Sequence, residues 1–197
     1  MKLYHKLNLN EDLVQRIKDA ALGDMKSINL ANGQMHFLKE PALCLNEFLS
    51  SELLPRVYNC ILFHRPGGVQ QPIHNDCNNK NPPETISCAI NIPLINCEDS
   101  YMEWFEGDYS TKISEALGKD GITRRYVDLD WNTPPKVIDR IVIDAPYLVR
   151  VSVPHRVTIT NKPRSLITLR FEGNPSFETI HQLFLEANLL EASTSLL

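Results

Sequence analysis

Glycine is scarce in this sequence, and cysteines in metal-binding pairs are absent. The 197 residues include 8 Gly and 13 Pro, a balance that favours an ordered, turn-rich domain over a flexible linker. The 5 Cys form no CxxC motif, and an odd number cannot form a complete set of disulfides within one chain. We therefore expect reduced thiols and a cytoplasmic protein.

The sequence also lacks long hydrophobic runs and clusters of positive charge. No apolar stretch approaches the length of a membrane span, and the N-terminus has no apolar signal-peptide core. The formal net charge is -4, and the densest basic cluster is the pair Arg124-Arg125. Because phosphate contacts need clustered Lys and Arg, this composition disfavours nucleic acid as a partner. It gives no indication of the oligomeric state.

Short β-rich runs separated by Pro, Gly and Asn fill the middle of the chain. Six runs predict strands: residues 57–63, 85–94, 136–143, 147–153, 157–160 and 165–171. Such spacing is typical of an antiparallel sandwich or jelly roll. We therefore predict one domain over residues 1–197, mainly β with flanking helices, with its core at about 57–171.

Helical patterns flank these strands. Apolar residues recur at helical spacing within 10–22 and 45–54, so the N-terminal segment 1–56 is expected to place two helices on one face of a sheet. A third helix is predicted at about 176–190, after Asn174-Pro175-Ser176. The polar stretch 106–135 interrupts the strand pattern. It is expected to be an insertion that recognises substrate or, equally, an ordinary surface excursion.

Three residues in the β-rich region have the chemistry of metal ligands. His74-Asn75-Asp76 is an H-x-D motif, and in an extended segment residues i and i+2 point to the same side. His155 follows 79 residues after Asp76, counted as 155 − 76. Two His and one carboxylate on one face of a metal leave three coordination positions open, as in non-haem Fe(II) oxygenases. Arg164 opens the last predicted strand, and a guanidinium can bind a carboxylate bidentately.

Taken together, these motifs resemble the Fe(II)/2-oxoglutarate-dependent dioxygenase superfamily. The resemblance runs from the segment Val57-Tyr58-Asn59-Cys60 through Gly67-Gly68 and H-x-D to His155 and Arg164 with its strand, and it is most similar to the prolyl-hydroxylase-like branch. It covers roughly residues 57–171. It implies a double-stranded β-helix, a cupin-like jelly roll, with Fe(II), 2-oxoglutarate and O2 as cofactor and co-substrates.

The resemblance also implies a role for each matching residue. His74, Asp76 and His155 correspond to the iron ligands, and Arg164 corresponds to the arginine that binds the distal carboxylate of 2-oxoglutarate. His64 stands where relatives often have a Tyr that contacts the same carboxylate, which is a departure from the pattern. Asn91 is expected to contact the co-substrate from the facing strand. Arg170 is the second choice for the carboxylate anchor, although its main expected role is an outer ion pair.

The implied reaction is hydroxylation of an unidentified substrate, either a protein side chain or a small molecule. Two alternatives stay open. One is a cupin-like enzyme with the same three ligands but no 2-oxoglutarate, which would have no use for Arg164. The other is a non-catalytic jelly-roll binding module, which metal content would distinguish. A zinc hydrolase is disfavoured because H-x-D…H differs from the usual catalytic zinc motifs.

Overall fold

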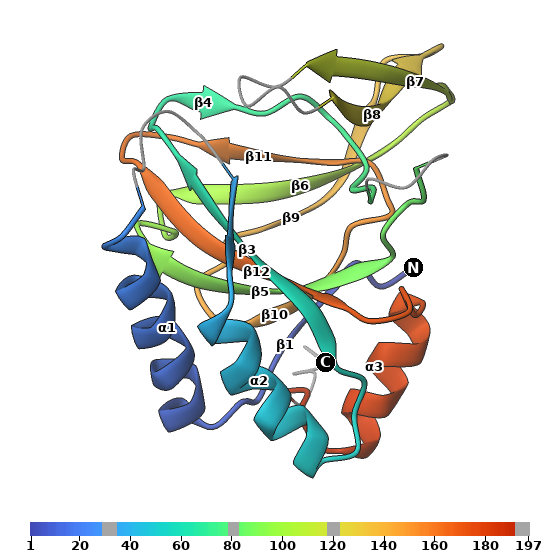
Figure 1. Ribbon diagram of the computed structural model, residues 1–197. Helices are drawn as coiled ribbons and strands as arrows, with labels where there is room; N and C mark the ends of the chain where they lie inside the picture. Colours follow the sequence, from blue (N-terminus) through green and yellow to red (C-terminus); the bar gives the residue numbers. More distant parts are fainter. Residues whose placement is uncertain (29–34, 79–82, 118–122, 192–197) are drawn as a thin grey trace, which may run out of the picture.

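The computed structural model describes residues 1–28, 35–78, 83–117 and 123–191, and within them two antiparallel sheets face each other (Figure 1). The larger sheet has the order β1-β10-β5-β12-β3-β2 and the smaller one β4-β11-β6-β9. The larger sheet contains β1 (Tyr4–Lys6), β2 (Met35–Leu38), β3 (Val57–Arg65), β5 (Cys88–Ile95), β10 (Tyr147–Arg150) and β12 (Arg164–Phe171). The smaller contains β4 (Val69–Gln70), β6 (Ser100–Glu106), β9 (Lys136–Ile141) and β11 (His155–Ile159).

The order of these strands defines the fold. From β3 to β6 the chain alternates between the two sheets, β6 pairs directly with β9, and from β9 to β12 the chain alternates back. The returning strands therefore pair with the outgoing ones, β11 with β4 and β12 with β3. This is the double-stranded β-helix, so the predicted fold class is confirmed. The short strands β1 and β2 extend the larger sheet at its two edges.

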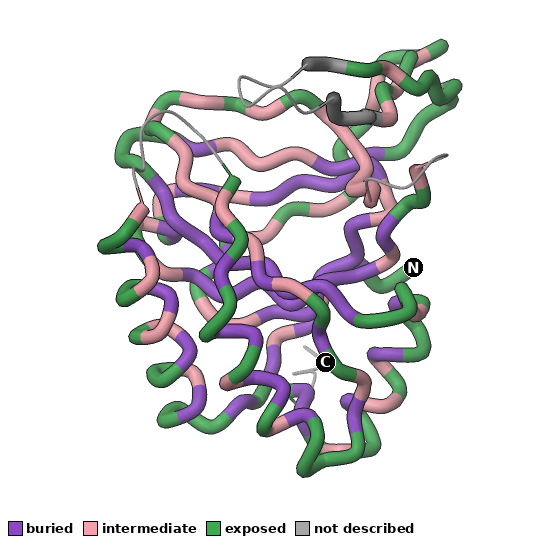
Figure 2. Tube along the Cα trace, in the orientation of Figure 1, coloured by how far each residue is buried: buried purple, intermediate pink, exposed green. Residues whose placement is uncertain are grey.

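Three helices cover the outer face of the larger sheet (Figures 1 and 2). They are α1 (Glu11–Met25), α2 (Glu40–Ser51) and α3 (Phe177–Glu186). The Asn10 and Ser176 side chains cap α1 and α3 by accepting a backbone N–H. The second helix begins earlier than predicted, because Pro41 occupies its first turn, where a missing N–H costs nothing.

Two hydrophobic clusters lie on opposite faces of the larger sheet. One joins the three helices to the sheet through residues such as Leu62 and Leu169, and the other fills the space between the sheets. Trp104 is fully buried in the second cluster and donates its indole N–H to the Arg150 carbonyl at 2.8 Å. Trp104 is therefore part of the core between the sheets.

The insertion forms regular structure that sequence reasoning missed. Its strands β7 (Tyr109–Leu117) and β8 (Thr123–Trp131) pair with each other in a separate two-stranded sheet, with Tyr109 opposite Trp131. The hairpin leaves the fold between β6 and β9 (Figure 1). Among the described residues, no helix is both long and apolar enough to cross a membrane.

Candidate metal centre

Backbone pairing brings the two predicted histidine ligands together. The N–H of His74 donates to the His155 carbonyl, and the N–H of His155 donates to the His74 carbonyl, both at 2.9 Å. His74 thus extends the pairing of β11 beyond the short strand β4. Because directly paired residues point to the same side, the two imidazoles lie together, with ring centroids 4.6 Å apart.

Each imidazole is oriented by a hydrogen bond to a nearby backbone carbonyl. The Nδ1 of His74 lies 2.9 Å from the Pro72 carbonyl, and the Nδ1 of His155 lies 2.9 Å from the Val153 carbonyl. A carbonyl can only accept, so Nδ1 carries the proton in both rings. That tautomer leaves Nε2 of each ring as a free lone pair, the form in which imidazole binds a metal.

Asp76 completes the group on the same side as His74. Its Oδ1 lies 3.6 Å from the His74 Nε2 and 3.9 Å from the His155 Nε2, and all three ligand atoms lie within 4.8 Å of one another. The His155 side chain is 5% exposed and that of His74 is 36% exposed, so the cluster is closed on one side and open on the other. Two nitrogens and one carboxylate oxygen in this arrangement fit a divalent transition metal such as Fe(II).

Arg170 holds the remaining oxygen of the aspartate. Its guanidinium donates to Asp76 Oδ2 at 2.5 Å, which leaves Oδ1 directed to the two imidazoles. Burial by itself raises the pKa of Asp76, but the Arg170 charge and the two histidines hold that pKa well below its ordinary value. Arg170 is 4% exposed and inside the fold, so the expectation of an outer ion pair is wrong.

The two histidines differ in their surroundings. Burial lowers the pKa of His155 to about 4, a shift that the Asp76 charge only partly offsets. Burial is also the largest influence on His74 and acts to lower its pKa, but the Asp76 carboxylate and the Pro72 carbonyl together outweigh burial and raise that pKa. His155 is therefore neutral near pH 7, as a metal ligand must be.

Arg164 is a buried cation on the same inner face. Alternation along β12 places Arg164, Leu166 and Arg170 on the face that looks toward the smaller sheet. Arg164 is 6% exposed and its Nε has no hydrogen-bond partner. In the described part of the chain no carboxylate is within ion-pair distance of it, and burial lowers its pKa. Arg170 lies six positions after Arg164, which corresponds to about 20 Å along the strand. The two arginines therefore lie at opposite ends of the site.

The remaining predicted contacts fall on opposite faces. Asn91 is opposite Thr168 on the inner face, and its buried Oδ1 has no partner. His64 is opposite Ser165 on the helix-covered face and is bonded to the Ser165 hydroxyl at 2.9 Å. We therefore correct the expected co-substrate contact of His64, because its side chain points away from the face that carries Arg164.

One polar residue of this face was missed by sequence reasoning. Asn59 on β3 is directly opposite Arg170, and its buried Oδ1 has no partner. The signal was the alternation in β3, because Cys60 and Leu62 are core residues of the helix-covered face and Asn59 lies out of phase with them.

The hairpin insertion lies close to the ligand segment. The backbone of Val127 on β8 approaches the thiol of Cys77, the residue after Asp76. The insertion therefore reaches the vicinity of the metal centre.

Comparison with known proteins yields structural likenesses only. No family model and no curated protein matches the sequence. A prolyl-4-hydroxylase from Pseudomonas putida matches at 15% identity and TM-score 0.44, over 86% of this chain and 92% of that one. The alpha-ketoglutarate-dependent carbocyclase SnoK of nogalamycin biosynthesis matches at 12% identity and TM-score 0.47, over 91% of this chain and 84% of that one. A viral collagen prolyl hydroxylase from Paramecium bursaria Chlorella virus-1 matches at 9% identity and TM-score 0.42, over 86% of this chain and 94% of that one.

SnoK is described as a non-haem enzyme, and the viral hydroxylase is a complex with 2-oxoglutarate. At such low identities and TM-scores, the function has to be argued from the side chains of this chain.

Proposed function

We propose that this protein is an Fe(II)- and 2-oxoglutarate-dependent oxygenase that hydroxylates a protein side chain or a small molecule. The observation that carries the proposal is Arg164, a buried cation with no carboxylate partner among the described residues, on the sheet face whose Arg170 holds Asp76. An unpaired buried charge is costly, so its retention favours a ligand that supplies the missing anion.

The residues of the centre fit both groups. Nε2 of His74, Nε2 of His155 and Oδ1 of Asp76 would hold the metal, and Arg164 would hold the distal carboxylate of the co-substrate at the far end. The bound iron and 2-oxoglutarate would supply the oxygen-activating chemistry. Arg170 would keep Asp76 deprotonated and limited to one coordinating oxygen, while apolar residues such as Leu166 keep water from the inner end.

Each alternative makes a different prediction. A cupin-like enzyme that does not use 2-oxoglutarate would gain nothing from the unpaired Arg164 charge, so that residue argues against it. A non-catalytic binding module has no need for both Nε2 atoms to face one carboxylate oxygen. Purified protein that contains no iron and has no affinity for Mn(II) would support the binding module.

The proposal is tested by succinate release with Fe(II), 2-oxoglutarate and O2. The Arg164→Ala variant should raise the 2-oxoglutarate concentration for half-maximal release by more than tenfold, because a charge-assisted pair contributes about 1.5–3 kcal/mol. Arg164→Lys should recover only part of the loss, since Lys lacks the bidentate geometry. The matched control is Arg140→Ala on the outer face of the smaller sheet, where the side chain is 57% exposed. Equal co-substrate requirements in all variants would refute the assignment of Arg164.

A further inference from the structure

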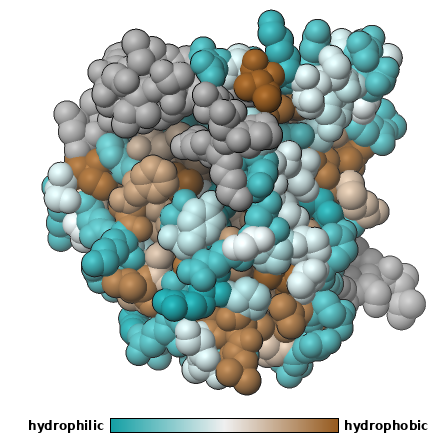
Figure 3. Space-filling model, turned by 45° about the vertical axis from the view of Figure 1, so that its right-hand side comes forward, coloured by the Kyte–Doolittle hydropathy of each residue, from teal (hydrophilic) through white to brown (hydrophobic). Residues whose placement is uncertain are grey.

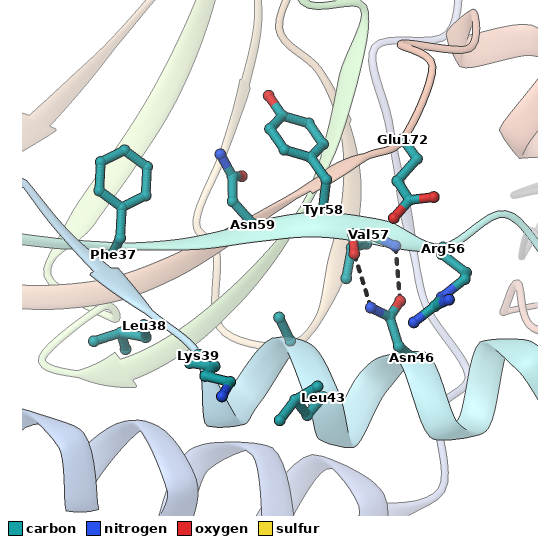
Figure 4. Close-up of a pocket in the computed structure, with 11 residues that line it drawn as sticks. Phe37, Leu38, Lys39, Leu43, Asn46, Arg56, Val57, Tyr58, Asn59 and Glu172 are labelled. Carbon is teal, nitrogen blue, oxygen red and sulfur yellow. Dashed lines mark hydrogen bonds between the residues drawn. The ribbon is translucent and has the colours of Figure 1, made fainter.

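A pocket of about 410 Å³ lies where β2 leaves the edge of the larger sheet (Figure 4). The strand β2 ends at Leu38, and β3 continues past it toward its own start at Val57. The pocket is lined from β2, α2 and β3 by Phe37, Leu38, Lys39, Ala42, Leu43, Asn46, Arg56, Val57, Tyr58 and Asn59, and by Glu172 after β12. Its volume falls within the range of ligand-binding sites.

The pocket shares a sheet face with the metal centre. Phe37 is opposite Ile61 on β3, and Ile61 lies two residues from Asn59, so all three share a face. Asn59 is in turn opposite Arg170, which holds Asp76. Asn59 in the pocket lining is therefore the strand neighbour of the residue that holds a metal ligand.

Two exposed aromatic rings flank a polar group at this point. Phe37 is 69% exposed and Tyr58 is 51% exposed. In Figure 4 both rings lie on the same side of β3, with the amide of Asn59 between them. The Oδ1 of Asn59 is buried and accepts no hydrogen bond from the described residues. The two rings thus present apolar surface on either side of a polar amide, as a ligand with an aromatic ring beside a peptide group would require.

The wall beneath these residues is fixed. The side chain of Asn46 on α2 accepts the N–H of Val57 at 2.7 Å and donates to its carbonyl at 2.8 Å, as a neighbouring strand would (Figure 4). Asn46 is 8% exposed, so this pair is protected from water. The start of β3 is therefore held on the side that β2 does not cover, and this wall of the pocket is part of the fold.

The exposure of the rings indicates the kind of ligand. Small-molecule sites enclose most of their ligand, whereas the exposure of Phe37 and Tyr58 leaves this pocket open to solvent as a groove. An extended chain passes through such a groove with its flanking residues outside. On the face that Figure 3 draws, hydrophobic groups lie among hydrophilic ones. A pocket of this size fits a short peptide better than a large protein interface.

We propose that the groove formed by Phe37, Tyr58 and Asn59 binds a peptide segment of the prime substrate, with an aromatic side chain near the residue that is modified. This inference rests on the proposed oxygenase function. The aromatic side chain packs against Phe37 and Tyr58, on either side of the Asn59 amide. Lys39 and Arg56 outnumber Glu172 at the rim, which favours acidic neighbours in the peptide.

The experiment measures the affinity of blocked pentapeptides for the full-length chain, without turnover, by calorimetry or NMR. The probe is acetyl-Gly-Glu-Phe-Glu-Gly-amide, compared with versions that carry Ala in place of Phe or Lys in place of Glu. The aromatic peptide should bind at least about tenfold more tightly than its Ala version, since ring stacking adds to burial. Phe37→Ala and Tyr58→Ala should each remove most of this difference. Leu185→Ala, an equally exposed apolar residue on α3, should not.

Three results would overturn the inference. The first is no preference for the aromatic peptide, and the second is unchanged affinity in both groove variants. The third is equally tight binding of acetyl-phenylalanine amide or of a nucleoside, which would make the ligand a small molecule. Succinate release by the wild-type chain is measured separately. Peptide binding that depends on Phe37 without any succinate would refute the oxygenase function and keep the groove. Succinate release without peptide binding would refute the peptide groove and keep the oxygenase function.

Discussion

The two faces of β12 are both buried yet chemically opposite. All eight residues of this strand are buried. Ser165, Ile167, Leu169 and Phe171 face the helices, whereas Arg164, Leu166, Thr168 and Arg170 face the smaller sheet. One face therefore holds the fold together by apolar contact, and the other carries two arginines that folding alone does not require.

The difference shows where the chain accepts a cost. Burying an apolar side chain stabilises by about 1.5–3 kcal/mol, whereas an isolated buried charge opposes folding. Arg170 is compensated by Asp76, but several polar atoms of the inner face have no partner among the residues that the structure describes. They belong to Arg164, Arg170, Asn59 and Asn91. Such atoms gather where a ligand completes the structure.

The largest effect is expected from Asp76→Ala on the inner face. It removes a metal ligand and leaves Arg170 without its partner, so Mn(II) affinity should fall by about 100-fold or more and turnover should disappear. Isothermal titration with Mn(II) measures the first effect, and circular dichroism checks that the strands persist. Retained Mn(II) affinity would contradict the metal centre.

The helix-covered face should respond in the opposite way. Leu169→Ala removes a side chain with no exposed surface and should lower the free energy of unfolding by about 2–5 kcal/mol. The Mn(II) affinity of the remaining folded protein should stay as in the wild type. Urea unfolding and metal titration of the same preparation separate the two quantities, and a loss of both would mean that the faces are not independent.

Arg164→Ala sharpens the contrast within the inner face itself. Besides weakening co-substrate binding, the variant removes an unpaired buried charge, so the ligand-free protein should be as stable as the wild type or more stable. Addition of 2-oxoglutarate with Mn(II) should raise the melting temperature of the wild type and have a much smaller effect on the variant. A strongly destabilised ligand-free variant would instead indicate a structural role for Arg164.

The apolar face was the easier one to predict from the sequence. Runs such as Val57–Arg65 gave the strands, because a face buried on helices selects β-branched and aliphatic residues. The error on His64 came from matching its position to a family motif without following the alternation, which places it with Cys60 and Leu62. The short strand β2 could not be predicted, since it pairs with β3, which lies far along the chain. The hairpin could not be predicted, since its strands are made mostly of exposed, polar residues.

The outer face of the smaller sheet shows how a buried charge is compensated when no ligand is involved. Glu103 on β6 is 1% exposed and accepts hydrogen bonds from Arg140 and Arg156. These arginines also lie over Tyr101 and Phe105. Burial acts to raise the pKa of Glu103, but its hydrogen bonds to the two arginines outweigh burial and lower that pKa.

The smallest expected effect follows from this cluster. A carboxyl whose pKa is lowered in the folded state stabilises the protein above its unfolded pKa of about 4.3, and this contribution disappears as the pH falls through the folded pKa. Glu103→Gln should therefore reduce stability at pH 7 by about 1–2 kcal/mol and flatten the loss of stability below pH 4. Melting temperatures between pH 3 and 7 measure both changes. The 2-oxoglutarate requirement should not change, because Glu103 faces away from the metal centre. If the melting temperature of the variant falls below pH 4 as steeply as that of the wild type, the ion pairs of Glu103 contribute nothing to acid stability.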